Sequence, residues 1–154
     1  MRDVLLTLFI VGLLPLLFWR PTWGVLAWVW FGLMNPHRLA WGFAMSLPFA
    51  QAIILATFAG AIISREPKRL KGGVATLVLL LFVAYITFTT FFALIPERAW
   101  PMLERAVKVQ IGTLLALTLL YRKEHVIALV WVVALSIGFY AVKGGIFTIL
   151  TLGA

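Results

Sequence analysis

The chain has 154 residues, of which 64% are hydrophobic, and it carries 13 Lys and Arg against 5 Asp and Glu, a formal net charge of +8. A mean hydropathy of +1.08, with apolar runs separated by short polar breaks, is typical of an integral membrane protein. The cations sit in those breaks, where they orient helices and meet anionic headgroups, so we exclude nucleic acid as a partner and expect the lipid bilayer.

The N-terminal region predicts two apolar helices of different length. The run from Val4 to Trp19 predicts a retained membrane helix, because no small-residue signal-peptide cleavage site follows it. After Arg20-Pro21, with Pro21 in the favoured first helical position, comes the apolar run from Trp23 to Met34. Its 12 residues reach only about 18 Å, against a hydrocarbon core of about 30 Å. We therefore expect a hairpin or a broken helix here.

The two clearest predicted spans run from Phe43 to Ile63 and from Val74 to Leu94. Each has 21 residues and no charge, which is long enough to cross a bilayer with modest tilt. Between them, residues 65–71 hold four cations in seven positions. Short loops of this kind favour the cytoplasmic side, so we predict that loop 64–73 is cytoplasmic.

Charged residues return between Pro96 and Gln110, with apolar residues recurring at helical spacing. This pattern predicts an interfacial amphipathic helix. Within it, Glu104 and Lys108 are four residues apart in the favourable order, so we interpret the charged face as solvated rather than as a substrate contact.

A short span from about Val107 to Leu120 is expected next. It is followed by a second basic break, residues 122–124, and by the run from Val126 to Val142, which is just long enough to cross. Two helices separate this break from the first one, loop 64–73, so residues 122–124 are also predicted to be cytoplasmic. The last apolar run, from Ile146 to Leu152, is too short to cross. Either it lies at the interface or the chain is the front part of a larger protein, and we favour the second interpretation.

These elements predict one all-α domain over residues 1–154. Its architecture is a polytopic transmembrane helical bundle with five to six membrane segments and one interfacial amphipathic helix. No motif indicates a cofactor. With no cysteine and two isolated histidines, the chain offers no metal site. Polar residues inside the predicted spans, namely Gln51, Thr87, Thr89 and Thr90, are expected to hydrogen bond within or between helices.

The candidate binding residues are Asn35, His37, Arg38, Trp41 and Lys143. Four of them stand in the stretch 35–43, where amide, imidazole, guanidinium and indole groups meet otherwise apolar sequence. Cations and donors at headgroup level suit an anionic lipid-linked substrate. The alternative is structural: Asn35 ends a helix, Arg38 reaches headgroups, Trp41 joins an aromatic belt, and Lys143 precedes a glycine cap. Both interpretations stay open.

Several motifs carry a resemblance to a known family. They are Met1-Arg2-Asp3, Arg20-Pro21 with Gly24, Met34-Asn35-Pro36-His37-Arg38-Leu39, Trp41-Gly42-Phe43, Gly138-Phe139-Tyr140 and Val142-Lys143-Gly144-Gly145-Ile146-Phe147-Thr148. The chain resembles the N-terminal domain of O-glycosylation ligases associated with the exosortase A system, a group similar to the O-antigen ligases and polymerases. The resemblance covers essentially the whole chain.

The resemblance implies a function in the bacterial cytoplasmic (inner) membrane. Members of that superfamily transfer glycan from an undecaprenyl-diphosphate carrier to a lipid or protein acceptor. Their catalytic histidine and arginines lie in a large periplasmic loop that has no counterpart in these residues, so no catalytic residue is carried over. The remaining part of such a ligase would then be a partner of this chain. A small membrane scaffold or transporter subunit, and a polymerase, are the alternative functions.

Overall fold

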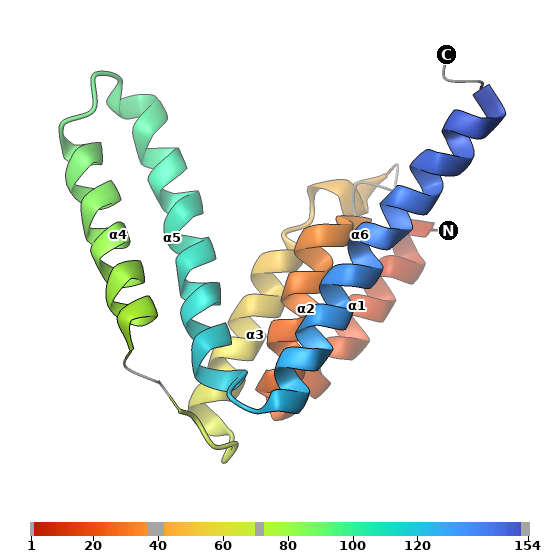
Figure 1. Ribbon diagram of the computed structural model, residues 1–154, viewed down its shortest axis with the longest axis horizontal. Helices are drawn as coiled ribbons and strands as arrows, with labels where there is room; N and C mark the ends of the chain where they lie inside the picture. Colours follow the sequence, from red (N-terminus) through yellow and green to blue (C-terminus); the bar gives the residue numbers. More distant parts are fainter. Residues whose placement is uncertain (1, 37–41, 70–72, 152–154) are drawn as a thin grey trace. The chain divides into compact units, whose positions relative to one another are not determined.

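The computed structural model describes residues 2–36, 42–69 and 73–151, and the elements defined in these ranges are all helical (Figure 1). By their internal contacts the residues form two compact units. Unit 1 comprises Met1–Glu66 and Arg122–Ala154, and unit 2 comprises Pro67–Tyr121. The all-α prediction is confirmed, while the prediction of one transmembrane domain stays a prediction.

Unit 1 contains five helical elements, whose bounds are as follows: α1 Arg2–Trp19, α2 Pro21–Met34, the 3-10 helix η2 Phe43–Ser46, α3 Phe49–Ile63 and α6 Lys123–Thr151. The first three α-helices contact one another, η2 lies against α1, and α6 packs along α2. Pro21 occupies the first turn of α2, as predicted, since its missing N–H has no helical partner there anyway.

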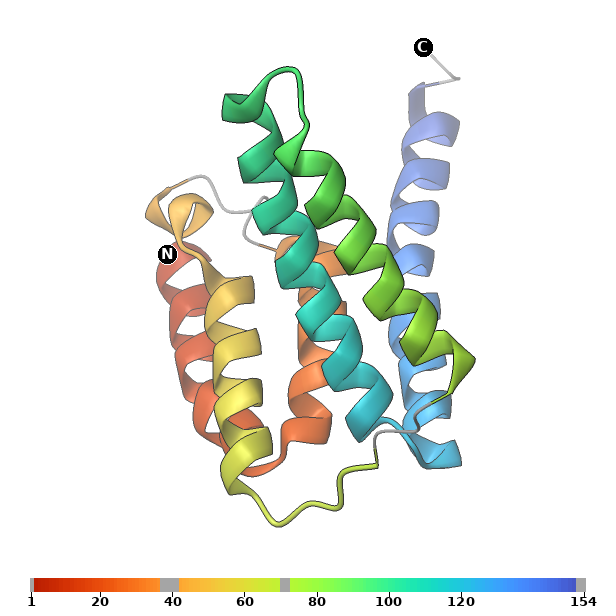
Figure 2. The ribbon, with the colours of Figure 1, turned by 90° about the vertical axis from the view of Figure 1, so that its left-hand side faces the viewer.

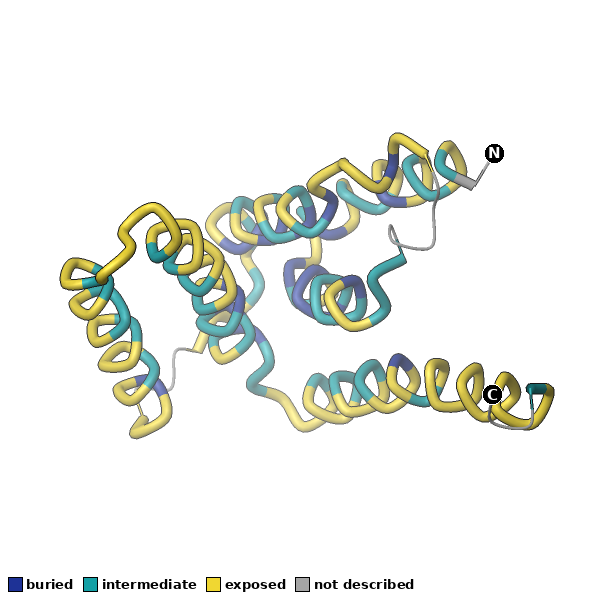
Figure 3. The backbone as a smooth tube through the Cα atoms, turned by 90° about the horizontal axis from the view of Figure 1, so that it is seen from above, coloured by how far each residue is buried: buried dark blue, intermediate teal, exposed yellow. Residues whose placement is uncertain are grey.

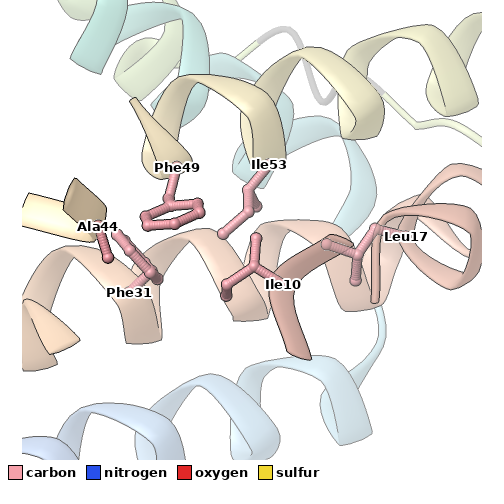
Figure 4. Close-up of a cluster of buried hydrophobic side chains, with 6 residues drawn as sticks. All are labelled: Ile10, Leu17, Phe31, Ala44, Phe49 and Ile53. Atoms are coloured by element: carbon pink, nitrogen blue, oxygen red, sulfur yellow. The ribbon is translucent and has the colours of Figure 1, made fainter. Parts of the chain in front are cut away.

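A small apolar core holds the first three helices of unit 1 together (Figure 4). Phe31 of α2 and Phe49 of α3 meet edge to face with their ring centroids 5.9 Å apart, and the cluster extends from them past Ile53 and Ile10 toward Leu17. The cluster consists of Ile10, Leu17, Phe31, Ala44, Phe49 and Ile53. Because it draws on α1, α2, η2 and α3, it fixes the position of each of these elements in the unit.

Two glycines let the helices of unit 1 approach closely. A Cβ placed on Gly24 of α2 would lie 2.2 Å from the Thr57 hydroxyl oxygen of α3. One placed on Gly60 of α3 would lie 2.1 Å from the Phe18 carbonyl oxygen of α1. Small residues at helix crossings are the usual way in which apolar helices gain packing contacts when there is little water to expel.

Unit 2 is an antiparallel helical hairpin. Helix α4 Val74–Phe91 leads through residues 92–95 into α5 Pro96–Leu119, and the two helices lie side by side in both ribbon views (Figure 2). At the connection, the rings of Phe91 and Trp100 stack edge to face at 5.4 Å. At the other end, the Arg69 N–H donates to the Thr118 carbonyl at 3.1 Å, so the chain before α4 returns to the end of α5.

Several predicted boundaries are wrong in informative ways. The span predicted from Phe43 to Ile63 is interrupted, because Leu47-Pro48 separates η2 from α3, and Pro48 cannot donate to a continuing helix. Helix α4 ends at Phe91 rather than at Leu94. In the C-terminal half, the predicted run from Val126 to Val142 and the described part of the last apolar run, residues 146–151, belong to one helix that passes through Gly144-Gly145.

The predicted interfacial helix is also not a separate element. The segment from Pro96 to Gln110 and the short span from Val107 to Leu120 form the single 24-residue helix α5. Among the described residues, two helices, α4 and α6, are long and apolar enough to cross a membrane. In each of them one residue is buried, Thr76 in α4 and Ser136 in α6. The remaining apolar side chains of these helices are largely on the surface (Figure 3).

Candidate functional site

The residue that ends α2 has a backbone conformation suited to a sharp change of direction. Asn35 has φ 43° and ψ 51°, the left-handed region, and its N–H bonds to the Phe31 carbonyl at 3.0 Å. Asparagine tolerates this conformation better than other residues with a Cβ. The structural part of the Asn35 prediction, helix termination, is thereby confirmed. His37, Arg38 and Trp41 lie outside the described residues.

A tyrosine from the far end of the sequence reaches the same helix end. The Tyr140 hydroxyl of α6 donates a hydrogen bond to the Met34 carbonyl, one residue before Asn35. This carbonyl belongs to the last turn of α2, where carbonyls lack a helical partner. Lys143 is exposed and lies three residues beyond Tyr140, about one helical turn. The structure thus brings the Asn35 and Lys143 regions to the same end of unit 1.

A carboxylate holds the chain where it enters η2. Asp3 accepts hydrogen bonds from the Gly42 N–H at 3.0 Å and the Ala44 N–H at 3.3 Å. A Cβ on Gly42 would lie 2.9 Å from an Asp3 carboxylate oxygen, so glycine suits this contact. Asp3 and Tyr140 therefore fix the two described ends that flank residues 37–41. Neither was singled out from the sequence as a functional residue, because each acts on backbone distant in the chain.

A second carboxylate, also missed from the sequence, caps α2 at its other end. Glu66 accepts from the Thr22 hydroxyl at 2.9 Å and from the Thr22 N–H at 3.3 Å. The first N–H groups of a helix have no intrahelical partner, and a negative charge there also complements the helix dipole. Both ends of α2 are thus held by side chains from other parts of unit 1.

The threonines inside α4 form hydrogen bonds with the backbone of their own helix. Thr87 and Thr90 donate to the backbone carbonyls four residues earlier at 2.8 and 2.7 Å, and Thr89 bonds to Tyr85 and Ile86 carbonyls. Of the two expected alternatives, hydrogen bonds within a helix or between helices, these three threonines therefore show the first. Gln51 is exposed near the start of α3.

The chemistry available at the candidate site is that of anion binding. The Asn35 amide can donate, and the Lys143 ammonium carries a positive charge that no acidic side chain of the described residues pairs with. No group of three or more His, Asp or Glu suited to a metal occurs in the described part of the chain. An amide donor and a cation are the kinds of group that bind phosphate, and the described residues of the site hold no pairing of a nucleophile with a base.

The described residues define an all-α protein that has two helices long and apolar enough to cross a membrane, and a hydrogen bond from Tyr140 that joins the segment before Lys143 to the end of α2. The chain matches the family model "Family of unknown function (DUF5935)" over residues 1–154, and it therefore belongs to this family. No curated protein and no solved structure matches it.

Proposed function

We propose that this chain is the membrane domain of a glycan ligase similar to the O-glycosylation ligases of the exosortase A system. In this proposal the complete enzyme transfers glycan from an undecaprenyl-diphosphate carrier to an acceptor. The chain contributes the part that holds the carrier, and catalysis is performed by residues outside it. The motifs that carry this resemblance extend from Met1 to Thr148.

Placement in a membrane is supported by the surface of the helices, and we propose the bacterial inner membrane because the resemblance implies it. The apolar side chains of α4 and α6 are mostly exposed, and a soluble monomer rarely shows apolar patches of this extent. Backbone-satisfied threonines and glycine-mediated helix contacts are also usual in lipid. We propose five to six membrane segments, with loops 64–73 and 122–124 in the cytoplasm.

The proposed carrier-binding residues are Asn35, His37, Arg38, Trp41 and Lys143. A diphosphate at headgroup level needs donors and cations, and a guanidinium binds phosphate oxygens through two parallel hydrogen bonds. The observation that carries the proposal is the Tyr140 contact with the Met34 carbonyl, because it joins the two most specific motifs at one end of unit 1.

The test is substitution of Arg38 in the complete cellular protein. Arg38→Ala should weaken donor binding by roughly ten- to hundredfold, since a hydrogen bond to a charged group contributes about 1.5 to 3 kcal/mol. Arg38→Lys should also be clearly impaired, because lysine is only a point charge. Gln51→Ala, in the exposed start of α3, is the matched control and should bind as wild type.

Two results would count against the proposal. Wild-type donor binding in both Arg38 variants, at wild-type expression, would reduce Arg38 to a headgroup residue. Glycan transfer by the purified 154-residue chain alone would contradict the assignment of catalysis to other parts of the enzyme. We expect no transfer, because one candidate base, His37, and a few cations do not make a positioned acceptor site.

A further inference from the structure

The charged residues of α5 share one face of the helix. At 100° per residue, the five charges fall within an arc of roughly 120°. All five are exposed, and they are Glu97, Arg98, Glu104, Arg105 and Lys108. The opposite side of α5 faces α4, where the two helices line a groove. That groove is lined by Phe82, Ile86, Thr89, Thr90 and Ala93, and by Ala99, Met102, Leu103 and Ala106.

The two edges of this charged face differ in their charge. On one edge Lys108 forms an ion pair with Glu104, and Glu97 stands two turns before Glu104. On the other edge Arg98 and Arg105 are seven residues apart, so they differ by only about 20° in direction and by about 10.5 Å along the axis. Neither arginine forms an ion pair with a carboxylate among the described residues. The arginine edge is therefore a pair of exposed guanidinium groups.

This edge runs alongside a helix able to cross a membrane. The groove places Ala106, the neighbour of Arg105, with Phe82 near the middle of α4. A guanidinium at that depth among lipid chains would lose its hydration, which is strongly unfavourable, and α5 continues past this point as one helix. The charged face must therefore meet water or a polar ligand rather than lipid chains.

We propose that Arg98 and Arg105 form a binding site for a phosphate-bearing anion on a water-accessible face of α5. Guanidinium groups bind phosphate through two parallel hydrogen bonds, and two of them aligned on one helix edge can hold one extended or two adjacent phosphates. A lipid headgroup and a free phosphate share this chemistry. The inference rests on the geometry of unit 2 and does not depend on glycan transfer.

The chain offers a natural reporter position for this site. Pro101 is exposed and lies on the charged face between the two arginines, three residues after Arg98 and four before Arg105. The native sequence has no cysteine, so a single Pro101→Cys substitution gives one reactive thiol, and removing a proline from a helix interior does not disfavour the helix. Val109→Cys, exposed one turn beyond Arg105, is a second reporter should the first variant fold poorly.

The first measurement compares two thiol reagents on the full chain in phosphatidylcholine vesicles. A sulfonate-bearing methanethiosulfonate should modify Pro101→Cys at least about threefold faster than a trimethylammonium-bearing one, because the three cations of this face outnumber Glu97 and Glu104 and attract the anion in water. Adding Arg98→Gln and Arg105→Gln should remove this preference. Leu103→Cys, on the side of α5 that faces α4, is the matched control and should react slowly with both reagents.

The second measurement identifies the phosphate source. Millimolar inorganic diphosphate should slow modification of Pro101→Cys at least about threefold if the ligand is a free phosphate, whereas protection only by phosphatidylglycerol in the vesicles indicates a lipid headgroup. Changing both arginines to lysine should keep the charge preference and lose the protection. The proposal is overturned by a thiol at position 101 that is unreactive with both reagents, by equal rates, or by protection from neither phosphate source.

Discussion

Gly60 shows how a single atom controls the packing of unit 1. Its missing Cβ leaves room for the Phe18 carbonyl oxygen, and that oxygen is backbone, so it can move only if α1 moves. Gly24 is less restrictive, because its nearest neighbour is the Thr57 side chain. The distance between α1 and α3 is thus set by the absence of one methyl group.

Gly60→Ala should destabilise the protein by about 1 to 3 kcal/mol, because overpacking a close helix contact outweighs the better helix propensity of alanine. Thermal unfolding in detergent micelles measures the change. Gly12→Ala is the control, since a Cβ there would meet no atom within 4 Å, and it should be neutral or stabilising by up to about 1 kcal/mol. Equal unfolding temperatures for the two variants would contradict the close contact.

Glu104 is a second residue whose behaviour follows from one neighbour. The hydrogen bond and the charge of Lys108, helped by the charge of Arg105, hold the pKa of the Glu104 carboxyl below its ordinary value. A carboxyl with a lowered pKa in the folded chain stabilises it above the pKa of the unfolded chain, and this contribution is lost as the pH falls through the folded value. The ion pair therefore supports α5 at neutral pH and not in strong acid.

Lys108→Gln should raise the pKa of Glu104 toward that of an isolated glutamate. A carbon-detected NMR titration of the Glu104 carboxyl in wild type and variant measures this change. An unchanged titration of Glu104 would mean that the pair with Lys108 does not persist in solution.

At the scale of the elements, the local sequence predicted which segments are helical, but it did not predict which segments contact one another. Apolar runs predicted helices, and Pro21 and Asn35 marked real helix ends. Gly144-Gly145 did not mark a helix end, since glycine is tolerated within apolar helices and α6 continues through both residues. The bonds of Asp3, Glu66 and Tyr140 join positions 39 to 106 residues apart, so no local pattern could reveal them.

The start of α2 provides a test of one such distant contact. Glu66→Ala should cost about 1 kcal/mol, as for the loss of a helix cap, while Glu66→Gln keeps an acceptor oxygen and should cost less. Thr22→Ala combined with Glu66→Ala should be clearly less than additive, because both remove the same bond. Strict additivity in denaturant unfolding would show that the two residues do not interact.

At the scale of the whole molecule, the question is which side of the membrane the basic breaks occupy. Within unit 2, the Arg69 N–H bonds to the Thr118 carbonyl, and the Arg69 guanidinium lies over the Tyr121 ring at 5.7 Å. The chain that enters α4 and the chain that leaves α5 are thus at the same end of the hairpin. This is the arrangement that two crossings between two basic breaks require.

The orientation itself is open to a direct test, because the chain has no native cysteine. Single cysteines replacing Gly72 and Lys123 should be protected from a membrane-impermeant maleimide in intact spheroplasts and should react after the membrane is permeabilised. Cations in short loops are retained in the cytoplasm, so both positions should give the same result.

A cysteine replacing Ile95, in the connection between α4 and α5, is the control and should be labelled from outside, since one crossing separates it from each basic break. Labelling of Gly72→Cys or Lys123→Cys in intact spheroplasts would reverse the proposed orientation. Equal labelling of all three positions would instead show that the hairpin of α4 and α5 does not cross the membrane.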